Sequence, residues 1–70
     1  MAHIPRIYDV RVLKREQLVV LDQKQIHHLL VWRVKIGDQI ILFDGLGKET
    51  FGYIKSQGRQ WIFYVEHLKN

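Results

Sequence analysis

The spacing of the apolar residues changes between Val34 and Gln39 of this chain of 70 residues, and that change limits the folds open to it. Between Asp22 and Val34 the apolar residues recur every three or four positions, which is typical of one face of a helix. From Gln39 onward they alternate with polar residues, as in half-buried strands. A chain this short folds as one domain and buries only about 60% of its unfolded surface. We therefore expect one helix and several strands to share a single small core.

The predicted helix runs from Asp22 to Val34. Asp22 is suited to the N-cap, and Gln25 three residues later completes a capping-box pattern. Lys35 falls in or just after the last turn, where a cation suits the carbonyl end, and Gly37 is expected to stop the helix. The face predicted to be buried consists of Ile26, Leu29 and Leu30, with Val34 near it.

The rest of the chain predicts about five short strands, at 8–13, 18–21, 39–43, 50–56 and 60–68, with Val10 and Val12 on one face of the first. Gly52, inside the fourth, indicates a bulge or a bend. Strands this short bury their apolar faces by curling. The predicted fold is mainly β: a small barrel capped by the helix, which lies between the second and third strands.

Seven apolar residues are assigned to the core of this barrel, while Trp32 is equally consistent with the core and with an exposed contact. The seven are Ile26, Leu29, Ile40, Leu42, Ile54, Trp61 and Phe63.

Composition excludes several classes of protein. There is no Cys, so neither a disulfide framework nor a zinc–thiolate site is available, which fits a cytoplasmic location. The N-terminus has no apolar stretch like that of a signal peptide, and apolar runs such as LLVW and IILF are four residues long, so we expect no membrane segment. The net charge of +4 favours a polyanionic partner.

Nothing in the sequence predicts catalysis or metal binding. His27 and His28 are neighbours, and neighbours on a helix point about 100° apart, so they cannot share one metal ion. We expect His27 to border the core and His28 to lie at its edge, one of them bonding a backbone carbonyl. The carboxylates are scattered; Asp38 and Asp44 are predicted to form turns. Ser56 has no partner for nucleophilic chemistry.

The basic residues suggest a nucleic-acid interface. They fall mainly in turns, at strand ends and near the end of the helix, and Tyr8 or Tyr53 is available for stacking on bases. A solvated surface of ordinary charged residues is the alternative, and composition does not choose between the two.

Four segments together resemble the N-terminal domain of RsmE-type methyltransferases: IPRIY at 4–8, HHLLVWR at 27–33, KIGD at 35–38 and ILFDGLG at 41–47. His27 takes the position of the family's helix histidine. The chain departs from the family pattern at Leu30, where an arginine is expected, and at Trp32, which replaces a leucine. Ile36 replaces a frequent proline. The basic stripe on the helix is therefore thinner than usual.

The resemblance implies a PUA-like barrel that recruits RNA, spanning 1–70 as a single domain. RsmE-type enzymes methylate N3 of a uridine in small-subunit ribosomal RNA. Their C-terminal SPOUT domain, with its trefoil knot, binds S-adenosylmethionine and forms the homodimer. That domain is expected in the full-length protein and is absent from these 70 residues, for which we expect no catalytic, cofactor or metal residues.

The resemblance also implies roles for individual residues. Arg6 and Arg33 are expected to contact phosphates, Lys35 and Lys48 to add electrostatic support, and Tyr8 to stack. Gly45, Gly47 and Asp44 are expected to shape the corner after the third strand. Two other functions stay open: a protein-interaction domain that braces the catalytic domain or the dimer, and a stand-alone RNA-binding protein.

Overall fold

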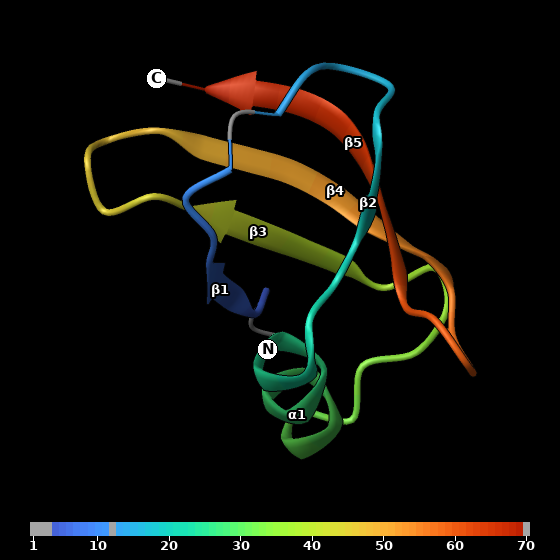
Figure 1. Ribbon diagram of the computed structural model, residues 1–70. Helices are drawn as coiled ribbons and strands as arrows, with labels where there is room; N and C mark the ends of the chain where they lie inside the picture. Colours follow the sequence, from blue (N-terminus) through green and yellow to red (C-terminus); the bar gives the residue numbers. More distant parts are fainter. Residues whose placement is uncertain (1–3, 12, 70) are drawn as a thin grey trace.

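The fold is a curled half-barrel of five strands with one helix, which confirms the mainly β prediction and the position of the helix. The structure, a computed structural model, describes residues 4–11 and 13–69 (Figure 1). Its elements are β1 (Arg6–Tyr8), β2 (Leu18–Val20), α1 (Gln23–Val31), β3 (Gln39–Phe43), β4 (Glu49–Ser56) and β5 (Ile62–Lys69). The strand order is β1-β3-β4-β5-β2, with β1 parallel to β3 and the other pairs antiparallel. The edge strands of the half-barrel are thus β1 and β2, and α1 lies beside β1.

The first strand is shorter and earlier than the predicted 8–13. Ile7 is its buried residue, and Ile7 pairs with Leu42 across the parallel β1–β3 ladder. After Tyr8 the side chain of Asp9 turns back to accept a hydrogen bond from the backbone of Arg11 at 2.9 Å, which ends the strand. Val10, predicted to share one face of that strand with Val12, lies after the end of β1 and is 64% exposed. Val12 lies outside the described residues.

The capping box of α1 is confirmed, but the helix ends earlier than predicted. Asp22 Oδ1 accepts from the backbone N–H of Gln25 at 2.8 Å, and Gln25 Oε1 accepts from the backbone N–H of Asp22 at 3.0 Å. Trp32 is the C-cap, and Arg33 takes a left-handed backbone conformation with φ +57°. The backbone N–H groups of Arg33 and Val34 donate to the carbonyls of Leu30 and Leu29, the bonding pattern of a Schellman motif.

Arg33 thus stops the helix, and the predicted role of Gly37 was wrong. Gly37, with φ +92°, belongs instead to the turn in which the N–H of Asp38 donates to the carbonyl of Lys35. Among the described residues, no helix is long and apolar enough to span a membrane.

The core predictions hold with one exception on the helix. Leu29, Ile40, Leu42, Ile54, Trp61 and Phe63 are buried, and Ile26 packs against them partly buried. Leu30 is more than half exposed, because the inward face of α1 is narrow and turns Gln25 and Leu29 toward the sheet. Trp32, left undecided by the sequence, is exposed. The predicted irregularity at Gly52 is confirmed, since the β4–β5 register shifts between Phe51 and Gly52.

Candidate nucleic-acid interface

Arg6 and Tyr8 point to the outer side of β1, because Ile7 between them faces the core. Both side chains meet Phe43 of the neighbouring strand. The Tyr8 and Phe43 rings form an edge-to-face pair with centroids 5.7 Å apart, and the Arg6 guanidinium lies 5.2 Å from the centroid of Phe43. Tyr8 nevertheless stays 58% exposed. One aromatic ring on β3 therefore holds a cation and an accessible tyrosine side by side.

Arg6 also forms an ion pair with Glu49 at the start of β4. The distance between Arg6 Nη1 and Glu49 Oε2 is 2.6 Å, and the arginine side chain remains about half exposed. This pair orients the guanidinium at the surface and offsets part of its charge. Surface pairs of this kind contribute little to stability, typically about 0–1 kcal/mol.

Hydrogen bonds to the side chain of Asp44 hold the glycine corner at 44–48 together, as predicted. Its Oδ1 accepts hydrogen bonds from the backbone of Leu46 at 2.7 Å and of Lys48 at 3.1 Å. The bond from Leu46, followed by that from Lys48, lowers the pKa of Asp44 below its ordinary value. Gly45 and Gly47 have φ values of +77° and +101°, which residues with a Cβ rarely adopt. Asp44 therefore shapes the corner that carries Lys48.

Two adjoining grooves share Arg6 and Phe43. The first, the α1–β1 groove, has a volume of about 340 Å³ and is lined chiefly by Arg6, Tyr8, Lys24, Gln25, His28 and Phe43. The second, the corner groove, has a volume of about 400 Å³ and is lined by Arg6, Phe43, Gly45, Gly47, Lys48 and Glu49. The fold thus brings Arg6, Tyr8 and Lys48, three of the five predicted RNA-binding residues, onto one surface.

Sequence reasoning missed the helix residues of this surface. Lys24 and His28 are four positions apart, so they lie on one face of α1, and both line the α1–β1 groove. That i, i+4 spacing was visible in the sequence. That this face lies opposite Arg6 and Tyr8 depends on how the helix packs.

Arg33 and Lys35, the other two predicted residues, lie at the opposite end of α1. The backbone N–H of Lys35 donates to Asp38 Oδ2 at 2.8 Å, which confirms Asp38 as a turn former. Both basic residues are exposed, and neither lines the α1–β1 groove or the corner groove. Tyr53, the alternative stacking residue, is half-buried against Tyr64, with ring centroids 5.3 Å apart.

The expected placement of the histidine pair was wrong. His27 and His28 are both exposed, because the inward face of α1 is taken by Gln25, Ile26 and Leu29. Among residues 4–11 and 13–69, no three His, Asp or Glu side chains gather into a group that could hold a metal ion.

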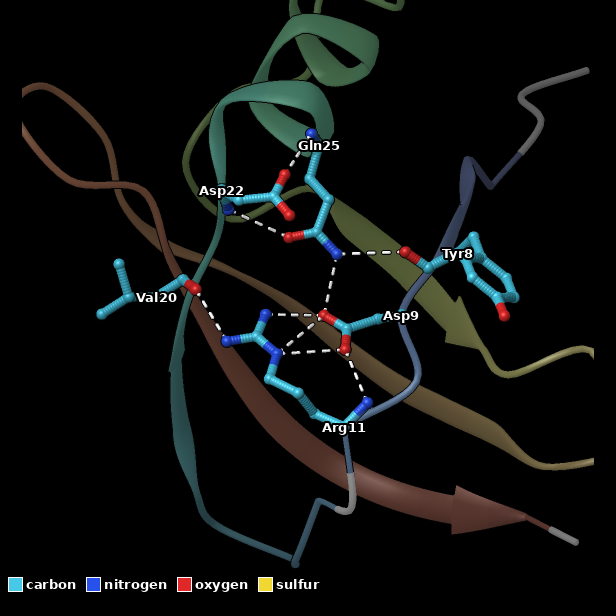
Figure 2. Close-up of polar contacts among 6 residues, drawn as sticks. All are labelled: Tyr8, Asp9, Arg11, Val20, Asp22 and Gln25. Carbon is cyan, nitrogen blue, oxygen red and sulfur yellow. Dashed lines mark hydrogen bonds and ion pairs between the residues drawn. The ribbon is translucent and has the colours of Figure 1, made fainter.

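A polar network that the sequence did not predict fixes the walls of the α1–β1 groove (Figure 2). The Asp9 side chain is only 3% exposed and accepts from Arg11 Nη2 at 2.6 Å and from Gln25 Nε2 at 2.7 Å. Gln25 also donates to the carbonyl of Tyr8 at 3.1 Å, and Arg11 Nη1 donates to the carbonyl of Val20 at 3.0 Å. The network therefore ties the end of β1 to α1 and to β2.

The pKa values of Asp9 and Arg11 are both shifted toward the charged forms. Burial raises the pKa of Asp9, but hydrogen bonds from Arg11 and Gln25 outweigh it and hold the pKa below its ordinary value. The bond to Asp9 likewise raises the pKa of Arg11. Both groups stay charged at neutral pH, and each buried hydrogen-bonding atom among the described side chains has a partner.

Comparison with known proteins shows similarity in both sequence and fold. Residues 21–60 match the family described as RNA methyltransferase PUA domain. A crystal structure of ribosomal RNA small subunit methyltransferase E from Neisseria gonorrhoeae, bound to S-adenosyl methionine, superposes with a TM-score of 0.89 at 30% identity. A protein from Legionella pneumophila, named as a candidate methyltransferase and bound to the same cofactor, superposes with a TM-score of 0.87 at 26% identity.

The similarity covers most of this chain and a minor part of the others. Each superposition covers 97% of this chain and 29% of the other chain. A comparison with curated protein sequences found no match.

Proposed function

The chain belongs to the RNA methyltransferase PUA domain family, and from this membership we propose that it binds RNA through the surface formed by the α1–β1 groove and the corner groove. The observation that carries the proposal is the gathering of Arg6, Lys24 and Lys48, from three separate segments, around Tyr8 and Phe43. Cations that neutralise phosphates, beside an aromatic ring for stacking, are the usual components of an RNA-binding surface.

The substrate proposed for the whole protein is small-subunit ribosomal RNA, methylated at N3 of a uridine. The name of the Neisseria protein, ribosomal RNA small subunit methyltransferase E, supports this choice. The role of the present residues is to bind and position the RNA, while a C-terminal SPOUT domain forms the homodimer and carries out the reaction. A cytoplasmic location and a part in ribosome biogenesis follow from this proposed substrate.

The residues described here do not fit S-adenosyl methionine, which both similar structures hold. The sulfonium centre of that molecule is a cation, and the α1–β1 groove presents two cations, Arg6 and Lys24, against one carboxylate, Asp22, which is already used in capping α1. Like charges brought together in a groove repel each other. We assign the cofactor to the part of the parent protein beyond this domain and derive no step through it.

A second function, docking of a protein, is favoured by one observation. Four apolar side chains near the end of α1 are more than half exposed: Leu30, Val31, Trp32 and Ile36. Clustered exposed apolar residues commonly mark protein contacts. This surface lies apart from the α1–β1 groove, so one domain can carry both functions.

Replacing Arg6 with alanine is expected to weaken RNA binding about three- to tenfold near 0.1 M salt. Loss of one phosphate contact also lowers the slope of log K against log salt concentration by about 1. The measurement is a fluorescence titration of a labelled single-stranded RNA at several salt concentrations. Arg59→Ala is the matched control, since it removes the same charge from the turn between β4 and β5, an eight-residue strand away from Lys48 (Figure 1).

Glu49→Gln removes the negative charge that is paired with Arg6 and therefore has the opposite effect on the charge of this surface. The amide still accepts a hydrogen bond from Arg6 but no longer offsets its charge, so affinity should rise about two- to fivefold. Equal losses for Arg6→Ala and Arg59→Ala, together with no gain from Glu49→Gln, would show that RNA contacts a different surface.

Arg33→Gly is expected to stabilise the domain and to leave RNA binding nearly unchanged. Glycine adopts the left-handed conformation of position 33 without steric cost, so the free energy of unfolding should rise by about 0.5–1 kcal/mol. Arg33 lines neither the α1–β1 groove nor the corner groove, so its loss should change RNA affinity less than about twofold. Urea denaturation and the same RNA titration measure the two effects, and a several-fold loss of affinity would show that the RNA also contacts the end of α1.

A further inference from the structure

We propose that the α1–β1 groove holds one unpaired nucleobase of the bound RNA, stacked on Tyr8. The inference rests on the proposed function and names the part of the RNA that this surface recognises. It concerns the groove between Lys24 and His28 of α1 and the edge strand β1, with Phe43 beside Arg6 and Tyr8.

The size of the groove suits a small ligand such as a single nucleobase. Its volume of about 340 Å³ lies at the small end of ligand sites, which usually span roughly 300–1,000 Å³. One wall is a helix face and the other is the outer edge of the sheet, so the groove admits a base that has left its stack. A base within a duplex has both faces covered by its neighbours and its pairing edge occupied, and it cannot enter.

The two walls are held at a fixed separation before RNA arrives. Gln25 of α1 donates to the carbonyl of Tyr8 and to Asp9, so two hydrogen bonds join the helix to the end of β1 (Figure 2). The ring of Tyr8 points away from this network. A preformed site avoids the entropy cost of ordering its walls on binding.

The chemistry of the lining matches a base with its phosphates. The Tyr8 ring is exposed and braced edge-to-face by Phe43, which leaves aromatic surface for stacking. Arg6 and Lys24 stand on opposite walls, so each can reach a phosphate on one side of the extruded nucleotide. His28 and Asp22 supply polar groups for the edge of the base, and Asp22 is already oriented by its bond to the backbone of Gln25.

The test compares two RNA ligands with equal numbers of phosphates. One is a single-stranded oligoribonucleotide with 2-aminopurine at its centre. The other is a hairpin with the same fluorescent base in its stem and a linker without bases in place of its loop, so that every base is paired. The 70-residue chain is expected to bind the single strand at least about tenfold more tightly and to change its 2-aminopurine emission. A single strand of the same length built from abasic nucleotides should lose most of that preference.

Variants at Tyr8 test whether the preference for the single strand depends on the α1–β1 groove. Tyr8→Ala should weaken binding of the single strand about tenfold and leave binding of the hairpin nearly unchanged, because one stacked base is lost. Tyr8→Phe keeps the ring and should behave as the wild type. Since the Tyr8 side chain is largely exposed, both variants are expected to fold, and circular dichroism checks this.

The outcomes separate this inference from the proposed function. If the chain binds both ligands equally with a normal salt dependence, or Tyr8→Ala binds the single strand as the wild type does, RNA binding stands and the base site is wrong. If Tyr8→Ala weakens both ligands to the same extent, Tyr8 contacts RNA outside a base-specific site and the inference also fails. If neither ligand binds, both proposals fall.

Discussion

Replacing Gly52 with alanine is expected to lower the free energy of unfolding by more than about 3 kcal/mol and to leave much of the chain unfolded. A Cβ at position 52 would overlap the carbonyl oxygen of Tyr64 and lie 2.7 Å from Cζ of Phe63. The ring of Phe63 is fully buried and occupies the space that a side chain at position 52 would need. Neither the backbone of β5 nor a packed core ring can move aside cheaply.

A loss of this size is enough to unfold much of the chain because the domain is small. Folded proteins are stable by roughly 0.05–0.15 kcal/mol per residue, so a 70-residue chain has little stability to lose. Urea denaturation followed by circular dichroism measures the effect. Gly47→Ala is the matched control, because nothing lies within 4 Å of a Cβ there and only its φ of +101° is strained. Equal losses for the two variants would contradict the steric explanation.

The second large effect is expected for Asp9→Asn, which should lower the free energy of unfolding by about 2 kcal/mol at neutral pH. The substitution keeps the shape of the side chain but removes the charge that accepts bonds from Arg11 and Gln25. Arg11 is partly exposed and can regain water, which limits the loss. Asp38→Asn is the control, since that exposed carboxylate accepts one bond from the backbone of Lys35 and should cost at most about 1 kcal/mol.

The stability lost in Asp9→Asn is expected to depend on pH. The pKa of Asp9 is lowered in the folded state, so its contribution is complete above the ordinary value near pH 4 and is lost as pH falls through the lower folded value. The stability difference between wild type and Asp9→Asn should therefore shrink between about pH 5 and pH 2. Denaturation curves at pH 7 and pH 3 measure it. A constant difference would show that the charge of Asp9 does not contribute.

Features that depend on neighbours along the chain could be predicted from the sequence. The capping box of Asp22 and Gln25 joins residues three positions apart, and Asp44 bonds amides two and four positions away. The bulge at Gly52 was also foreseeable, because glycine inside a strand has few other uses.

The end of the helix and the start of the sheet were predicted less well. Arg33 stops α1 in a left-handed conformation usually taken by glycine, which is why Gly37 looked like the stop. The pattern in YDVRVL predicted a strand over 8–13 with Val10 and Val12 on one face. In the structure Asp9 is the buried residue, because Gln25 from the helix and Arg11 supply its partners.

For the candidate site, the sequence supplied the residues and the tertiary structure decided which of them meet. Arg6, Tyr8 and Lys48 were identified with Arg33 and Lys35 as one set, yet the fold separates them into two places. Lys24 and His28 entered only with the packing of α1 beside β1.

The amino-acid sequence by itself determined the mainly β class, the single capped helix and most of the core, because apolar periodicity and capping act over a few residues. Only the tertiary structure decided the pairing of β1 with β3, the burial of Asp9 and the gathering of cations around Phe43. These join segments 16 or more positions apart in the chain, such as Asp9 with Gln25, and no local pattern specifies which distant segments will meet.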